Sequence, residues 1–165
     1  MNKAIFLDRD WVLNYDSNYA HKIEDLIVLP WVREWLHLLK DAWYKLIVVS
    51  NQSWIGRWYY TLEDFSAFTY ELAKEVDIKF DAICCCPHHP SAGCECRKPK
   101  AGMVLAIAEE LNIDLTQSRL IGDKESDIQC WKNAGCKTIL IGDDDFWSDY
   151  RCLTLLDAAD IIIGL

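Results

Sequence analysis

Short apolar segments rich in β-branched residues recur along this chain, and segments with helical periodicity separate them. The apolar segments are typical of buried strands. They lie at residues 3–7, 45–50, 81–85, 119–122 and 138–141, with a last candidate at 160–163. This regular alternation restricts the chain to α/β architectures, in which crossover helices join parallel strands.

The intervening segments predict four helices, at residues 31–40, 61–76, 102–111 and 126–134. The second begins with Thr61-Leu62-Glu63-Asp64, which has the spacing of a capping box. Residues 153–158 are expected to form at most a short helix. We therefore predict a doubly wound, Rossmann-like parallel sheet in a single domain over residues 1–165. Ligands of such sheets bind beyond the carboxyl ends of the strands.

The charge balance restricts the possible partners. The formal net charge is -9 and the isoelectric point is near 4.8, which leaves no broad basic surface for nucleic acid. No apolar run is long enough to span a membrane, and the chain starts in a strand-like segment without a signal-peptide pattern. We expect a cytoplasmic monomer that binds a small anionic substrate through a few local cations, with neither nucleic acid nor membrane as a partner.

Two aspartates directly follow the first predicted strand, in the segment Phe6-Leu7-Asp8-Arg9-Asp10. A carboxylate can attack phosphorus while a second acid protonates the leaving oxygen. Alone, such a pair is more often a solvated turn. Phosphoryl transfer also needs cations and donors around the phosphate, and these follow other strands at Ser50, Asn51, Arg97, Lys98, Asp123 and Lys124. We therefore predict Asp8 as the nucleophile, Asp10 as the acid/base and Mg²⁺ as the cofactor.

Five of the eight cysteines lie between Cys84 and Cys96, in a chain without a targeting segment. We therefore expect reduced thiols and a metal rather than disulfides. Four of the residues here suit a closed tetrahedral Zn²⁺ site, namely Cys86, His88, Cys94 and Cys96. Zinc would order the loop at 86–98 and place the following Arg97 and Lys98. A reduced loop without metal is the alternative, and Cys84 and Cys85 are interpreted as small core residues.

Together these motifs resemble the haloacid dehalogenase superfamily of aspartate-nucleophile phosphatases. Within it the chain is most similar to the D-glycero-D-manno-heptose 1,7-bisphosphate phosphatase family. The segments that carry the resemblance lie between residues 3 and 142: Asp8-Arg9-Asp10, Tyr19-Ala20-His21, Ser50-Asn51-Gln52-Ser53, Cys86-Pro87-His88-His89-Pro90, Cys94-Glu95-Cys96-Arg97-Lys98-Pro99 and Gly122-Asp123-Lys124.

The resemblance implies an essentially capless phosphatase that removes the 7-phosphate of the heptose bisphosphate through an aspartyl-phosphate. Mg²⁺ would be held by Asp8, Asp123 and the backbone of Asp10, and the loops at 14–24 and 86–98 would wall the site. Ser50 and Lys98 would act with the two aspartates on the reacting phosphate. The residues expected to bind substrate are Asn51, Arg57, Arg97 and Lys124.

Two alternatives remain open at this point. Related phosphatases with the same zinc loop accept histidinol phosphate, so that compound is a rival substrate. A catalytically impaired, zinc-stabilised binding protein of the same fold is the other alternative. The presence of Asp8, Asp10, Lys98 and Asp123 favours an enzyme.

The chain has eight tryptophans and seven glycines, an unusual ratio. Six tryptophans fall where the resembling family has, or often has, glycine: Trp11, Trp31, Trp43, Trp54, Trp58 and Trp131. Glycine adopts positive φ freely, whereas a bulky residue there is strained. We hypothesise that the source organism reads UGA codons at these positions as glycine. The alternative is a tryptophan-rich lineage with adapted loops, and genuine tryptophans would put the activity in doubt.

Overall fold

The computed structural model describes residues 1–16 and 19–164. Its centre is a six-stranded sheet with the order β3-β2-β1-β4-β5-β6, in which every neighbouring pair is parallel. The strands are β1 (Ala4–Leu7), β2 (Lys45–Asn51), β3 (Ala82–Cys86), β4 (Arg119–Gly122), β5 (Lys137–Ile141) and β6 (Tyr150–Cys152). The predicted doubly wound α/β fold is confirmed.

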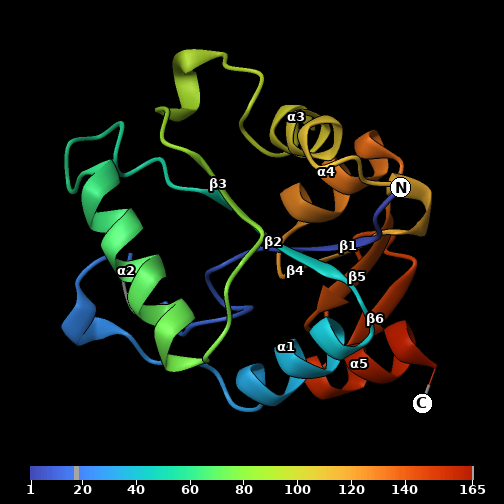
Figure 1. The fold of residues 1–165 in the computed structure, drawn as a ribbon. Coiled ribbons are helices and arrows are strands. Elements are labelled where there is room, and N and C mark those ends of the chain that lie inside the picture. The colour runs from blue at the N-terminus through green and yellow to red at the C-terminus, as the bar shows by residue number, and fades with distance from the viewer. Residues whose placement is uncertain (17–18, 165) are drawn as a thin grey trace.

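Helices cover both faces of this sheet (Figure 1). The helices are α1 (Val32–Asp41), α2 (Leu62–Glu75), α3 (Gly102–Glu110), α4 (Glu125–Ala134) and α5 (Leu155–Ile163), with 3-10 turns η1 (Ile23–Asp25), η2 (Pro90–Ala92) and η3 (Leu115–Gln117). α1 packs beside α5 on one face, and α3 and α4 lie on the other. Among the described residues, no helix is both long and apolar enough to cross a membrane.

The two faces have separate hydrophobic cores because successive side chains of a strand point in opposite directions. In β1, Ile5 and Leu7 pack into the core beneath α1 and α5, whereas Ala4 and Phe6 pack into the core beneath α3 and α4. All four residues are fully buried. β1 is thus rigidly held, and the loop that follows it starts from a fixed position.

The second predicted helix begins as its sequence indicates. The Thr61 hydroxyl accepts a hydrogen bond from the backbone N–H of Asp64 at 3.1 Å, and the Asp64 carboxylate accepts one from the backbone N–H of Thr61 at 2.8 Å. This reciprocal capping box satisfies two backbone donors at the start of α2. The capping prediction is confirmed.

The predicted strand at 160–163 is wrong. These residues belong to α5, which starts with a capping box between Thr154 and Asp157. Its buried residues follow helical spacing, namely Leu155, Ala158, Ala159 and Ile162. The sixth strand is instead Tyr150–Cys152, and the short helix expected at 153–158 extends to Ile163.

Four of the six tryptophans at expected glycine positions adopt the left-handed backbone conformation. Their φ angles are 64° at Trp11, 66° at Trp31, 64° at Trp43 and 65° at Trp58. Trp54 and Trp131 do not share this conformation, and Trp131 is fully buried in α4. The backbone conformation that favours glycine is therefore found at four of the six positions.

Candidate active site

The carboxyl ends of β1, β2 and β4 open into one polar cavity with a volume of about 250 Å³. Parallel strands expose this edge to ligands because the chain leaves it through short loops. The residues that line the cavity are Asp8, Asp10, Asp16, Tyr19, Ser50, Asn51, Gln52, Ser53, Trp54, Tyr60, Arg97, Lys98, Lys124, Ser126 and Asp127. The structure thus brings together most of the predicted site residues.

Asp8 follows β1 directly and lies almost completely buried at the base of the cavity. Its Oδ1 accepts a hydrogen bond from the backbone N–H of Arg9 at 2.8 Å and lies 3.1 Å from Nζ of Lys98. Burial raises the pKa of Asp8 above its ordinary value, although the Lys98 ammonium opposes this shift. Both of these polar contacts are made by Oδ1. The other carboxylate oxygen, Oδ2, takes part in neither and is available to react.

Lys98 connects three elements of the site. Its buried ammonium contacts Oδ1 of Asp8 at 3.1 Å and Oδ1 of Asp127 at 2.6 Å, and it donates to the carbonyl of Val49 at 2.9 Å. Burial lowers the pKa of Lys98, but the carboxylates of Asp127 and Asp8 outweigh burial and hold it above its ordinary value. Lys98 therefore remains a fixed positive charge beside Asp8.

The backbone of Lys98 is fixed to the end of β2. Asn51 donates from Nδ2 to the Lys98 carbonyl at 3.0 Å, and its Oδ1 accepts from the Lys98 N–H at 3.0 Å. Asn51 is thus occupied in positioning Lys98, although it also lines the cavity. Ser50 is buried and accepts a hydrogen bond at Oγ from the amide of Gln52 at 2.7 Å.

Arg9 holds the carboxylate of Asp10 from one side. Its Nε donates to Oδ1 of Asp10 at 2.8 Å, and one of its terminal nitrogens donates to the carbonyl of Ala20 at 2.9 Å. The guanidinium is buried and faces the rings of Phe65 and Phe68 on α2, at 5.1 and 4.6 Å from the ring centroids. Contacts of this kind stabilise a desolvated cation.

Asp8 belongs to a cluster of three carboxylates. Oxygen atoms of Asp8, Asp123 and Asp127 lie within 4.8 Å of one another. Oδ1 of Asp123 is buried without a hydrogen-bond partner among the described residues, and burial together with the charge of Asp8 raises the pKa of Asp123 to about 7. Hard divalent cations prefer clustered oxygen ligands of this kind. These residues fit Mg²⁺.

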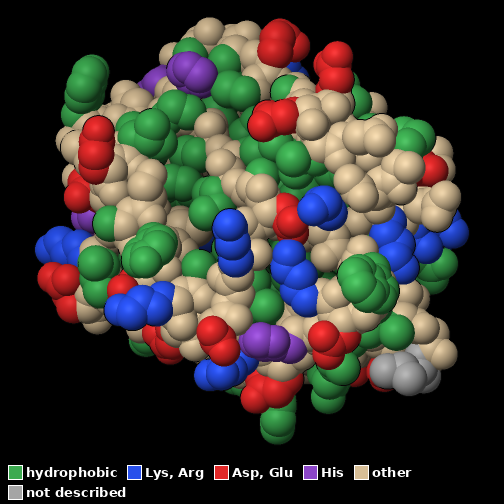
Figure 2. Space-filling view, in the orientation of Figure 1, with side chains coloured by type: hydrophobic (Ala, Val, Ile, Leu, Met, Phe, Trp, Pro, Cys, Tyr) green, Lys and Arg blue, Asp and Glu red, His purple; other side chains and the backbone are tan. Residues whose placement is uncertain are grey.

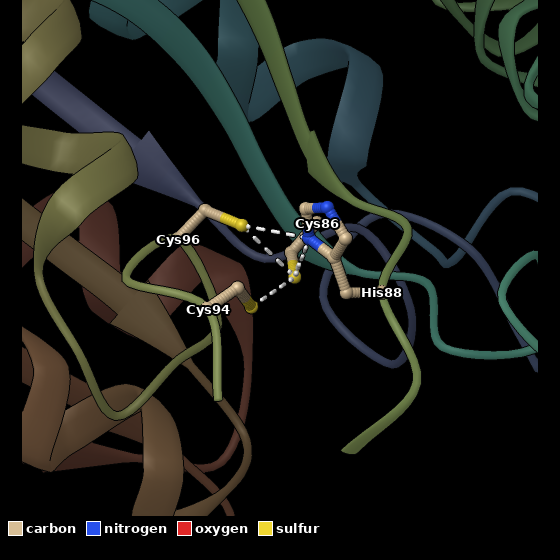
Figure 3. Close-up of side chains that lie close together, drawn as sticks. All are labelled: Cys86, His88, Cys94 and Cys96. Carbon is tan, nitrogen blue, oxygen red and sulfur yellow. Dashed lines mark hydrogen bonds between the residues drawn. The ribbon is translucent and has the colours of Figure 1, made fainter. Parts of the chain in front are cut away.

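The four predicted zinc ligands converge at the end of β3 and in the loop that follows (Figure 3). Sγ of Cys86 lies 3.7 Å from Sγ of Cys94 and 3.3 Å from Sγ of Cys96, and Nδ1 of His88 lies 3.1 Å from Sγ of Cys96. A tetrahedral site with Zn–S bonds of about 2.3 Å separates its donors by roughly 3.8 Å. The donor set and its spacing fit Zn²⁺.

The predicted substrate-binding residue Arg57 and the side chain of Trp11 both lie outside the cavity lining. Arg57 is exposed, and its guanidinium stands 5.1 Å from the ring of Trp54 rather than in the cavity lining. Trp11 packs against Tyr15 at 4.6 Å and borders a separate apolar pocket, so its side chain does not fill the site. Of the expected wall at 14–24, residues 17–18 lie outside the described part of the chain.

Residues in or beside the cavity that were not singled out in the sequence include Arg9, Gln52, Tyr60 and Asp127. Asp127 lies four residues after Asp123, in the first turn of α4. At that spacing the side chain can point back to the end of the strand before the helix, so the sequence could have indicated it. Gln52 follows the Ser50-Asn51 pair. Tyr60 lies beyond an irregular loop, so no periodic pattern indicates that it reaches the cavity.

The surface matches the expected charge balance. Figure 2 shows Lys and Arg side chains interspersed with Asp and Glu on one face of the molecule. Within the site, Arg97, Lys98 and Lys124 line the cavity. These three cations lie among the aspartates of the lining, where they can contact a small anion.

Comparison with known proteins gives consistent matches. The HAD-hydrolase-like family model matches residues 95–149. A D-glycero-β-D-manno-heptose-1,7-bisphosphate 7-phosphatase of Helicobacter pylori is 44% identical over 144 residues, covering 85% of this chain and 83% of the relative. The corresponding enzyme of Campylobacter jejuni, named for the α anomer, is 42% identical over 159 residues, covering 92% of this chain and 91% of the relative.

Solved structures agree with the sequence relatives. The D,D-heptose 1,7-bisphosphate phosphatase of B. bronchiseptica, in complex with magnesium and phosphate, superposes with a TM-score of 0.90. It is 28% identical in sequence, and the match covers 98% of each chain. The α/β fold and the phosphatase family are therefore shown by independent comparisons.

Proposed function

Because this chain belongs to the D-glycero-D-manno-heptose-1,7-bisphosphate 7-phosphatase family of HAD-like hydrolases, we propose that it removes the 7-phosphate of that sugar bisphosphate. The observation that carries the proposal is the placement of Asp8 and Asp10 in one cavity, with the Lys98 ammonium 3.1 Å from Asp8. Nucleophile, acid and phosphate-binding cation are thereby assembled in one place.

In the first half-reaction, Oδ2 of Asp8 attacks phosphorus and forms an aspartyl-phosphate. The bond from phosphorus to the sugar oxygen breaks, and that oxygen takes a proton from Asp10. In the second half-reaction, Asp10 removes a proton from water as the water attacks the same phosphorus. Asp8 is released and inorganic phosphate leaves.

The neighbouring residues bind and orient the phosphoryl group. Ser50 and Lys98 line the same cavity as Asp8, and their donors are suited to phosphate oxygens. Mg²⁺, held by Asp8, Asp123 and the backbone carbonyl of Asp10, would supply positive charge to offset that of the transferring group. Arg97, Lys124 and Asn51 also line the cavity and would contact the rest of the substrate. Arg57 stays a weaker candidate because it lies outside the lining.

Zinc bound by Cys86, His88, Cys94 and Cys96 would have a structural role. All four positions of a tetrahedron would be taken by protein ligands, which leaves none for water. The last ligand, Cys96, directly precedes Arg97 and Lys98. The zinc site would therefore act on the reaction by holding the backbone of these two cations.

The deciding experiment measures Mg²⁺-dependent phosphate release from both anomers of heptose 1,7-bisphosphate and from histidinol phosphate. We expect a heptose bisphosphate to be the preferred substrate and heptose 1-phosphate to be the product, identified by phosphorus NMR. Preference for histidinol phosphate would contradict the proposed substrate. Release of the 1-phosphate would contradict the proposed position of attack.

Asp8→Asn tests the nucleophile because the substitution keeps the size of the side chain. We expect turnover to fall by at least about 10⁴-fold, since a carboxamide cannot form the aspartyl-phosphate. Asp144→Asn, on the exposed loop after β5, is the matched control and should keep full activity. Retained turnover in Asp8→Asn would remove Asp8 from this role.

A further inference from the structure

The carboxylate of Asp10 is held by donors on both oxygens. Oδ1 receives hydrogen bonds from Nε of Arg9 at 2.8 Å and from Nδ2 of Asn14 at 3.1 Å. Oδ2 receives one hydrogen bond, from Nε2 of Gln52 at 2.9 Å. A carboxylate oxygen has two lone pairs, so Oδ1 is saturated. Oδ2 accepts one hydrogen bond and keeps its second lone pair free.

Gln52 is itself fixed in one orientation. The side chain is buried, and Nε2 donates both to Asp10 and to Oγ of Ser50, at 2.9 and 2.7 Å. Its carbonyl Oε1 accepts a hydrogen bond from the Tyr60 hydroxyl at 2.5 Å. An amide rotated by half a turn would present oxygen to Asp10 and nitrogen to Tyr60. The Asp10 carboxylate, which only accepts, and the Tyr60 hydroxyl, which donates to Oε1, together favour the orientation that directs N–H groups at Asp10 and Ser50.

Tyr60 is suited to this role. It is buried, and its ring stacks on His21 with a centroid distance of 4.6 Å and an interplanar angle of 11°. Burial raises the pKa of Tyr60 well above its ordinary value, so the hydroxyl keeps its proton. A neutral phenol in a fixed position is a constant donor to Gln52.

We propose that Tyr60 and Gln52 form a positioning relay that makes Oδ2 of Asp10 the atom that gives and takes the catalytic proton. Neither residue touches the reacting phosphorus in this scheme, so both are positioning residues. The proposal rests on the proposed function, in which Asp10 is the acid. It adds which oxygen carries the proton and what holds that oxygen in place.

The test exploits the leaving group. An alkoxide such as a sugar oxygen needs a proton when the bond to phosphorus breaks, whereas p-nitrophenolate leaves without one. The value of kcat/KM reports the steps up to formation of the aspartyl-phosphate. Loss of acid positioning therefore lowers kcat/KM for an alkyl phosphate and spares that for p-nitrophenyl phosphate.

We expect Gln52→Met to lower kcat/KM for the sugar phosphate about 10- to 100-fold, and Tyr60→Phe about 3- to 10-fold, because misplacing a general acid removes part of its contribution. Both should change the value for p-nitrophenyl phosphate less than about 3-fold. Matched controls are Gln129→Met and Tyr70→Phe, at exposed positions of α4 and α2, which should leave both substrates unaffected.

The outcomes separate the relay from the proposed function. Equal losses on both substrates, or no loss on either, would overturn the relay. Asp10→Asn is the reference variant. If it lowers kcat/KM for the sugar phosphate alone, but Gln52→Met and Tyr60→Phe do not, the relay is refuted and the proposed function stands. If Asp10→Asn itself shows no selective loss, the acid role of Asp10 falls, and the relay falls with it. Tyr60→Phe preserves shape, so the test does not depend on how Gln52→Met folds.

A separate observation concerns the tryptophans. Trp147, with a φ of 58°, joins Trp11, Trp31, Trp43 and Trp58 in the left-handed region. Five of the nine described non-glycine residues with positive φ are thus tryptophan. A bulky side chain is rare in this conformation, whereas glycine, asparagine and aspartate are common. Chance placement of tryptophan would not select such positions.

The end of α1 shows the pattern most clearly. The backbone N–H of Trp43 donates to the carbonyl of Lys40 at 2.9 Å, and that of Tyr44 donates to the carbonyl of Leu39 at 3.0 Å. This pair of bonds is a Schellman motif, whose left-handed residue is usually glycine. Trp43 occupies that place with 88% of its surface exposed, so its indole buries little that could offset the strain.

We infer that cells of the source organism insert glycine at positions 11, 31, 43, 58 and 147, and that the gene has UGA there. UGA is a stop codon in the standard genetic code, but other codes read it as tryptophan or as glycine. The backbone carries this inference at the five positions. Trp54 and Trp131 have other conformations and are outside it.

Peptide mass spectrometry of the protein isolated from its native cells tests the inference, together with the codons of its gene. Glycine masses at the five positions and UGA codons are expected. UGG codons, or tryptophan in the native peptides, would overturn the inference. In addition, the chain with five glycines should have a higher Tm than the chain with five tryptophans, and an equal or lower Tm would argue against the strain on which the inference depends.

Discussion

Among single residues, Lys98 determines whether two carboxylates can stay charged in a buried site. Asp8 and Asp127 both contact its ammonium, and each side chain is almost inaccessible to water. An unpaired charge in such surroundings costs several kcal/mol. Lys98 therefore has two roles that substitutions can separate: it stabilises the fold, and it supplies positive charge to the bound phosphate.

Lys98→Met should lower the free energy of unfolding by about 3–5 kcal/mol, since it leaves the carboxylates of Asp8 and Asp127 without a cation. The double variant Lys98→Met/Asp127→Asn should recover about half of that loss, because one buried charge is removed with the lysine. Both variants should be inactive, because both lack the lysine. Denaturant unfolding measures the role of Lys98 in stability, and phosphate release measures its role in activity. Equal destabilisation of the single and double variants would contradict this account of the ion pairs.

The neighbours of Asp8 could be predicted from sequence motifs, whereas the hydrogen-bond partners of Asp10 could not. Asp8 and Asp123 each follow a strand, and Lys98 lies two residues after the predicted zinc ligand Cys96, so their meeting at one edge could be predicted from the order of elements. The contact of Gln52 with Asp10 depends on the rotation of an amide, which is held in part by Tyr60, a residue beyond an irregular loop. Side-chain orientations of this kind have no periodic signal in a sequence.

Among the elements, the zinc loop is held by close backbone contact on two sides. An added Cβ at Gly56 would lie 2.5 Å from the backbone N of His89, and one at Gly102 would lie 2.4 Å from the carbonyl oxygen of Glu95. Both distances are shorter than side chains tolerate. The loop after β2 and the start of α3 therefore pack directly against the zinc loop, which joins β3 to Lys98.

Removal of zinc should loosen this loop and lower activity indirectly. With Mg²⁺ kept in excess, a zinc chelator is expected to reduce turnover about 10-fold or more, because the backbone that carries Arg97 and Lys98 loses its anchor. Limited proteolysis should cut between residues 86 and 98 in the treated protein. Added Zn²⁺ should reverse both effects, and Cys96→Ser should be insensitive to the chelator. A zinc-free protein with an unchanged rate would refute this coupling.

The elements at the two ends of the chain differ in how well their sequences indicate them. β1 is a buried run directly before a motif, and its position could be predicted closely. The run Ile161-Ile162-Ile163 suits a strand or a helix equally, since a short apolar run has no clear period. Tertiary packing of α5 against α1 decides in favour of the helix. β6 has three residues, two of them exposed, and gives almost no signal.

For the whole molecule, the parallel sheet concentrates negative charge at one edge. β1 supplies Asp8, β4 is followed by Asp123, and the first turn of α4 returns Asp127 to the same place. Burial raises the pKa of Asp8, and burial with the charge of Asp8 raises the pKa of Asp123 to about 7. Asp8 and Asp123 therefore hold protons more readily in the fold than in the unfolded chain.

Mg²⁺ should therefore stabilise the protein more at about pH 8 than at about pH 5. The pKa of Asp123 rises from about 3.9 in the unfolded chain to about 7 in the fold. Between these values the folded state binds more protons than the unfolded state. Stability of the metal-free protein thus falls as the pH rises through that window. Mg²⁺ binds the deprotonated carboxylates, so protons compete with it at low pH.

At a Mg²⁺ concentration of about 100 times Kd, binding adds about 2.7 kcal/mol, which corresponds to an increase in Tm of about 5–10 °C for a domain of this size. Thermal unfolding with and without Mg²⁺ should show this increase at about pH 8 and little of it at about pH 5, because a protonated Asp123 cannot bind the cation. Asp123→Asn should abolish the increase at both pH values, whereas Asp144→Asn should preserve it. An equal increase at both pH values would mean that Asp123 is not a ligand of the cation.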